Sequence, residues 1–195
     1  MAAEISNSEK TEAITVPYPA FHSATRSNCG FVDIRGRADL AAQIPECLNS
    51  ANLKGFLMRL AASEAPLFSV GCDLGSHTDL ALEKHRREIA GGYVQVVSSW
   101  YSKIAPQDWA SLFNSVGDAI ENQSASDDWT VHFELAPIKV NLDGFNGLTG
   151  SVTTNFFAHA PSRQKALNSR ERLIGVLDVA LSDDRIMEAF KGRNF

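Results

Sequence analysis

The segment Trp129–Ala160 constrains the fold more than any other part of the chain, because its apolar residues recur at every second position. Over Trp129–Leu135 the alternation is complete, and a period of two is typical of a half-buried strand. A break at Ala136–Pro137 and a glycine-containing turn predicted at Asp143–Gly150 divide the segment. The pattern therefore predicts two or three antiparallel strands in the middle of a sheet.

Two regions of the chain share one predicted order of elements, because Phe31–Leu74 and Tyr93–Leu142 each read as strand, helix, strand and strand. The elements predicted in the first region are a strand at Phe31–Ile34, a helix over Ala38–Ala51 and strands at Lys54–Ala61 and Leu67–Leu74. Pro45 should either divide that helix into two short pieces or kink it, since proline removes a backbone hydrogen bond and clashes with the preceding turn. The shared order is compatible with an internal duplication of a β-α-β-β unit.

Further helices are expected in three places. Thr78–Ala90 has helix-favouring residues with charged pairs at four-residue spacing, and an amphipathic stripe follows Pro106. Ser162 is placed to cap a helix over Arg163–Leu181. Strands followed by helices in this order favour an α+β fold, with helices packed on a mostly antiparallel sheet of about five to seven strands.

Chain length and charge limit the class of protein. The chain has 195 residues, of which 44% are hydrophobic, and its formal net charge is -5. These values favour a single α+β domain over residues 17–195, preceded by a polar and flexible segment at residues 1–16. The acidic charge argues against nucleic acid or a membrane surface as a partner, since both require a basic surface.

The cysteines and the apolar segments indicate a cytoplasmic protein. Cys29, Cys47 and Cys72 are widely spaced and form no CxxC motif, so free thiols in a reducing compartment are expected. The first ten residues are polar, which is not typical of a signal peptide. No apolar run approaches the roughly 20 residues that cross a bilayer.

A possible catalytic centre lies in Gly71–His77, which combines a thiol, a carboxylate and an imidazole at the end of a predicted strand. A cysteine nucleophile needs a base that converts it to the thiolate. Cys72 with His77 as its base is therefore the candidate catalytic pair, and His132 or His159 is an alternative base. A small core cysteine followed by a polar turn accounts for the same residues without catalysis.

Other polar and aromatic residues suggest a binding surface. His132 and Glu134 are two positions apart in a predicted strand, so they share a face and could serve a metal site, an acid–base pair or simply a solvated sheet face. Asp73, His77 or His159 could supply a third metal ligand if their strands are neighbours. Trp100, Tyr101 and Phe157 belong to a set of aromatic residues that cannot all lie on one core face. Either helices cover both faces of the sheet, or an aromatic patch forms a contact surface.

These observations favour a cytoplasmic, non-catalytic protein-binding protein of the adaptor, chaperone or immunity type, which uses a sheet face or a loop edge. A protein partner is expected, self-association is an alternative, and no cofactor or metal is expected. The competing hypothesis is a small hydrolase or transferase centred on Cys72 and His77 or on His132 and Glu134. A small-ligand carrier would require a pocket between the sheet and the helices.

Overall fold

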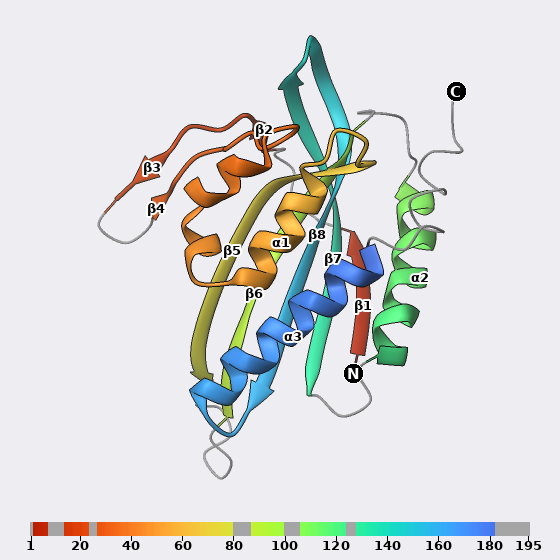
Figure 1. Ribbon diagram of the computed structural model, residues 1–195. Helices are drawn as coiled ribbons and strands as arrows, with labels where there is room; N and C mark the ends of the chain where they lie inside the picture. Colours follow the sequence, from red (N-terminus) through yellow and green to blue (C-terminus); the bar gives the residue numbers. More distant parts are fainter. Residues whose placement is uncertain are drawn as a thin grey trace.

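A six-stranded mixed sheet forms the centre of the fold (Figure 1). The structure, a computed structural model, describes residues 2–7, 14–23, 27–79, 87–99, 106–123 and 128–181. The strands of the sheet are β1 (Ala2–Asn7), β2 (Thr15–Val16), β5 (Leu67–Asp79), β6 (Arg87–Ser98), β7 (Trp129–Leu142) and β8 (Phe145–Ala160). Their order is β1-β7-β8-β6-β5, with β2 also beside β7. In this sheet β1 and β2 each pair with β7 in parallel, and the other pairings are antiparallel. The predicted α+β class is confirmed.

Three α-helices and two short 3-10 helices accompany this sheet in the described residues. They are η1 (Ala38–Gln43), η2 (Pro45–Leu48), α1 (Ala51–Leu60), α2 (Pro106–Gln123) and α3 (Arg163–Leu181). The two 3-10 helices meet at Pro45, so the predicted division of this region into two helical pieces is confirmed. A two-stranded hairpin of β3 (Phe21–His22) and β4 (Ser27–Asn28) stands apart from the main sheet (Figure 1).

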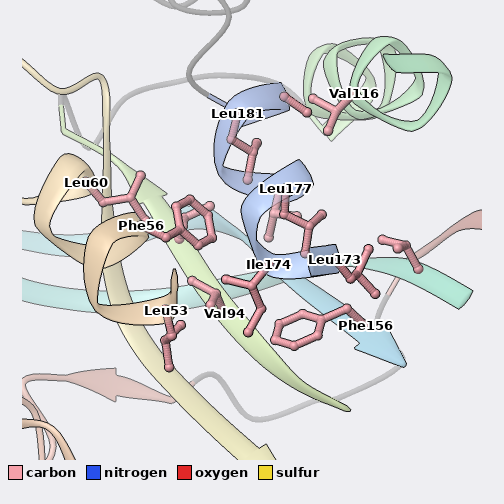
Figure 2. Close-up of a cluster of buried hydrophobic side chains, with 14 of the residues drawn as sticks. Leu53, Phe56, Leu60, Val94, Val116, Phe156, Leu173, Ile174, Leu177 and Leu181 are labelled. Atoms are coloured by element: carbon pink, nitrogen blue, oxygen red, sulfur yellow. The ribbon is translucent and has the colours of Figure 1, made fainter. Parts of the chain in front are cut away.

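The main core lies between the sheet and the three α-helices. In Figure 2, side chains of α1 and α3 meet those of β6 and β8, with Ile174 between Val94 and Phe156. Helix α2 joins the same core, and its Phe113 ring lies 4.8 Å from the Phe133 ring of β7. Because each helix packs its apolar stripe into this one core, all three helices cover the same face of the sheet.

The predicted break at Ala136–Pro137 marks a change of buried face rather than the end of a strand. Before it, alternate residues of β7 such as Phe133 face the helices. After it, Ile138 and Val140 are buried on the opposite face, in a second and smaller core with Val16. Helices cover one half of the long strand, and the segment that begins near β2 covers the other half on the opposite side.

The turn between β7 and β8 is shorter than predicted. Only Asp143 and Gly144 form it, both with positive φ angles of 52° and 79°, and β8 begins at Phe145. A two-residue turn with both φ angles positive matches the twist of a hairpin. Most of Asp143–Gly150, predicted as a turn, is therefore strand, and the hairpin stays in register from Leu142 opposite Phe145 to Trp129 opposite Ala158.

Several local predictions were wrong. Lys54–Ala61, predicted as a strand, lies almost entirely in α1, where the buried residues recur at helical spacing and Ser50 caps the first turn. Phe31–Ile34 forms no strand. In the predicted helix Thr78–Ala90, the first two residues belong to β5 and the last four to β6, while residues 80–86 lie outside the described residues.

These differences change the order of elements. The first half runs η1, η2, α1 and β5, whereas the second runs β6, α2 and one long strand, β7. The halves therefore do not share a strand-helix-strand-strand order. Residues 2–7 and 15–16, within the segment expected to be flexible, form β1 and β2 against the edge of β7.

Candidate functional site

The sheet face opposite the helices carries polar side chains in two rows that cross the strands. In the first row Asp73, Tyr93, Asn155, His132 and Glu4 lie opposite one another on β5, β6, β8, β7 and β1. In the second row Gln95, Thr153, Glu134 and Ser6 occupy the next same-face positions on β6, β8, β7 and β1. We call these nine residues, together with Phe157, the open face.

Register places the open face on one side, because residues paired across strands point to the same face. Adjacent strands are about 4.8 Å apart, so a row of five strands is roughly 19 Å wide. The apolar residues of the described helices belong to the core on the other side of the sheet. None of the described helices therefore covers the open face.

Side-chain hydrogen bonds fix several polar groups at the open face. The His132 Nε2 atom lies 2.8 Å from Ser6 Oγ, which links β7 to β1. Gln95 Nε2 donates to Ser151 Oγ at 2.9 Å, and that hydroxyl donates to the Ala136 carbonyl at 3.1 Å. Such cross-strand bonds orient the amide and imidazole groups before any ligand arrives.

The open face also includes an aromatic ring. Phe157 lies opposite Gly91 on β6 and Thr130 on β7. A Cβ atom at position 91 would lie 2.6 Å from Phe157 Cδ1, which shows that the ring packs over the bare backbone of that glycine. The half-buried ring thus adds an apolar element beside the polar rows.

A cavity of about 350 Å³ lies at the outer edge of β5. Tyr18, residues 28–32 and 34, helix η2 and the strands β5 and β6 line it with aromatic, apolar and polar groups. Its walls include Tyr18, Phe31, Glu46, Cys72, Asp73 and Tyr93. We call this space the edge cavity; Asp73 and Tyr93 belong both to it and to the open face.

The Cys72 thiol lies in this cavity in an environment that disfavours the thiolate. Burial raises the pKa of the Cys72 thiol far above its ordinary value, and the nearby acidic groups Glu46, Cys47 and Asp73 raise it further. A reactive cysteine needs the opposite, a positive environment that lowers the pKa. Its chemistry is therefore that of a neutral, weakly polar wall of the cavity.

His77, the predicted base, does not adjoin Cys72. Both residues belong to the extended strand β5, and five residues of strand place their Cα atoms about 16 Å apart. The two positions also pair with different parts of β6, Val94 for Cys72 and Ile89 for His77. The fold thus separates the candidate catalytic pair.

The other predicted site residues fall into two groups. His132, Glu134 and Phe157 come together on the open face, while Trp100 and Tyr101 lie outside the described residues. In the part of the chain that the structure describes, no three His, Cys, Asp or Glu side chains are grouped closely enough to hold a metal ion. Asp73, one proposed third ligand for His132, is three strands away, about 14 Å.

Sequence reasoning singled out Cys72 and Asp73 within the Gly71–His77 cluster but missed most of the other residues that line the edge cavity, above all Tyr18 and Glu46. Tyr18 follows β2 and its hydroxyl donates to the Val70 carbonyl of β5 at 3.0 Å, which ties the N-terminal segment to the sheet edge. Glu46 is half-buried in η2. Neither position belongs to a recognisable motif, and only the fold brings them together.

A second cavity, of about 660 Å³, lies between β5, η2 and α3. It differs from the edge cavity in carrying charges of both signs, including the buried Arg170, whose Nη2 donates to Glu171 Oε1 at 3.0 Å. Ser50 donates to the other carboxylate oxygen of Glu171 at 2.7 Å. These polar groups are satisfied within the fold and join α3 to the start of α1.

Neither the described helices nor comparisons with known proteins assign the chain to a class of protein. No described helix is long and apolar enough to cross a membrane. No protein-family model matches the chain, and searches of curated proteins and of solved structures found no similar protein or structure.

Proposed function

We propose that this protein is a non-catalytic binding module whose open face recognises a protein partner. The observation that carries the proposal is the pair of polar rows across the sheet, on a face that none of the described helices covers. Oriented hydrogen-bonding groups beside a half-buried aromatic ring are the features from which protein interfaces are built.

The charge of the open face indicates the kind of partner. Its two rows contain three carboxylates, those of Glu4, Asp73 and Glu134, and one imidazole, that of His132, but no lysine or arginine. A partner with a basic surface would be electrostatically complementary, and complementarity raises both the association rate and specificity. A cytoplasmic setting fits the three free cysteines, of which Cys29 is exposed.

The catalytic alternative has weaker support. Cys72 lacks both a low pKa and a neighbouring His77, and the His132 imidazole already contacts Ser6. An acid–base pair of His132 and Glu134 would need a substrate pocket above them, and neither residue lines the edge cavity or the second cavity.

Site-specific photocrosslinking in cells of the source organism tests the proposal. Benzoylphenylalanine at Thr153, in the middle of the open face, should yield a discrete crosslinked protein that mass spectrometry identifies. The matched control is the same probe at Val179 on α3, which is 59% exposed on the helical side. Thr153→Arg should weaken capture of that protein at least tenfold, because it adds bulk and positive charge to the interface.

Identical products from both probe positions, or no product from Thr153, would count against the open face as the binding surface. A product made of two copies of this chain would identify self-association as the interaction. Circular dichroism of each variant shows whether its fold is retained.

A further inference from the structure

The edge cavity has a chemical character distinct from the rest of the protein. It contains the carboxylates of Glu46 and Asp73, and no lysine or arginine is among the described residues that line it. A volume of about 350 Å³ lies within the range of small-molecule sites, roughly 300–1,000 Å³. The edge cavity is therefore large enough for a small organic ligand and negatively charged.

The two carboxylates differ from six other described acidic groups, each of which pairs with an arginine. The described carboxylates that pair with an arginine are Asp33, Asp39, Asp128, Asp143, Glu171 and Asp178. Glu46 and Asp73 form no ion pair with any described residue. Two carboxylates without a cationic partner among the described residues thus line one cavity, Glu46 half-buried and Asp73 exposed.

Aromatic rings complete the walls of the edge cavity. Tyr18 and Phe31 lie edge to face with ring centroids 6.2 Å apart, and Tyr93 contributes a third ring from β6. The Tyr18 hydroxyl is fixed by its bond to the Val70 carbonyl, so this ring is held in place before binding. Aromatic faces attract ammonium and guanidinium groups within about 6 Å of the ring centroid.

The titration of the neighbouring groups agrees with a negative potential. Burial raises the pKa of the Tyr18 hydroxyl to about 12, and Tyr93, Cys72 and Glu46 add to the shift. Of these neighbours only Glu46 is a carboxylate, because the Tyr93 hydroxyl and the Cys72 thiol are uncharged at neutral pH, so the negative potential comes from Glu46 and from Asp73. A bound cation would be attracted by this negative potential, whereas an anion would be repelled by it.

We propose that the edge cavity binds an organic cation, a primary ammonium or guanidinium group on a short apolar body. The charged end would be attracted by Glu46 and Asp73 and by the tyrosine rings, and the body would pack against Ile34 and Ile44. The cation could come from a free amine or from a lysine or arginine side chain of a peptide. The edge cavity shares Asp73 and Tyr93 with the open face, whereas Glu46 lines the cavity alone, so Glu46→Gln separates this inference from the partner proposed for the open face.

Ligand-observed NMR and calorimetry on the full chain test the inference with matched probes. Phenethylamine should bind, while 2-phenylethanol, which has nearly the same shape without the charge, should bind at least tenfold more weakly. Glu46→Gln and Asp73→Asn should each weaken phenethylamine binding about fivefold to tenfold, and the double variant should abolish it. Glu64→Gln, an exposed carboxylate outside the cavity, is the control that should leave affinity unchanged.

The source of the cation is distinguished by a capped glycine–arginine–glycine tripeptide. Tighter binding of the tripeptide than of phenethylamine, with the same loss in Glu46→Gln, would assign the site to a peptide side chain; the reverse order would assign it to a free amine. Equal affinity for phenethylamine and 2-phenylethanol, amine binding that neither substitution weakens, or no binding of either cation would overturn the inference. The double variant must retain the native circular dichroism spectrum, which its isosteric amides favour.

Discussion

Replacement of Gly91 by alanine should destabilise the sheet, whereas the same replacement at Gly75, its direct partner on β5, should not. A Cβ atom at position 91 would lie 2.4 Å from the Phe156 carbonyl oxygen and 2.6 Å from Phe157 Cδ1. At position 75 no atom lies within 4 Å of the added Cβ. The two glycines occupy the same cross-strand pair, so they form a matched test of the packing across β6 and β8.

The expected magnitude follows from the nature of the clash. Overpacking typically costs about 1–3 kcal/mol, and Gly91→Ala should reach that range because a backbone carbonyl as well as a ring must move. The reduced entropy of the unfolded chain offsets about 0.4–1 kcal/mol of this cost. At Gly75 the entropic gain stands alone, so Gly75→Ala should be neutral or should stabilise by up to about 1 kcal/mol.

Urea unfolding followed by circular dichroism measures both free energies. For a chain of 195 residues, each kcal/mol should also lower the midpoint of thermal unfolding by about 2–4 °C. If Gly91→Ala proves as stable as the unsubstituted protein, Phe157 does not pack across β6 as described. If both substitutions destabilise equally, the pairing of β5, β6 and β8 is in another register.

Three other predictions concern the thiols and a helix cap. Burial, and to a lesser extent Glu46, raises the pKa of the Cys47 thiol to about 11, and the pKa of the Cys72 thiol is raised further. A thiol reagent at pH 8 should therefore modify the exposed Cys29 rapidly and the other two cysteines slowly. Rapid labelling of Cys72 would contradict its described environment. Because unfolded cysteines ionise near pH 9 while the folded Cys47 stays protonated, the free energy of unfolding should fall as the pH rises from 9 to 11, and Cys47→Ala should reduce that fall in urea titrations. Ser50→Ala should lower the free energy of unfolding by about 1–2 kcal/mol in the same assay, since the hydroxyl caps α1 and also donates a hydrogen bond to Glu171 on α3. As the control, Ser63→Ala in the exposed turn after α1 should change the free energy of unfolding little.

The elements that the sequence predicts well are those whose buried face is decided locally. The whole of Arg163–Leu181 forms α3, and the alternation over Trp129–Leu135 corresponds to the side of β7 that faces the helices. In both segments a long run of residues repeats one period, so neighbouring elements do not alter the choice between helix and strand. Pro45 likewise acts through its own ring, and the helical region divides there.

Lys54–Ala61 was misjudged because a short apolar window contains both periods. Phe56, Met58 and Leu60 alternate, but Met58 is 40% exposed in the structure while Leu53 and Leu57 are buried. A window that begins at Ser50 shows the helical spacing and a capping hydroxyl before it. The residues just before Lys54 therefore decide for a helix, and no tertiary effect is needed to explain it.

The open face and the edge cavity differ in how far the sequence can reveal them. His132 and Glu134 share a face by the geometry of any strand, so this part was predictable, although the uncovered state of the face depends on where the helices pack. The edge cavity joins Tyr18, Glu46 and Asp73 from segments far apart in the chain, and no local pattern predicts their meeting.

One signal for the edge cavity does exist in the charge pattern. Asp33 and Asp39 each have an arginine two positions away, with which the structure pairs them. Glu46 and Asp73 have no lysine or arginine within four positions on either side. An acidic residue that lacks a local cation must find one through the fold or remain in water, and Glu46 is half-buried without one among the described residues. Carboxylates isolated in sequence and gathered by the fold around aromatic rings are therefore where an external cation is to be sought first.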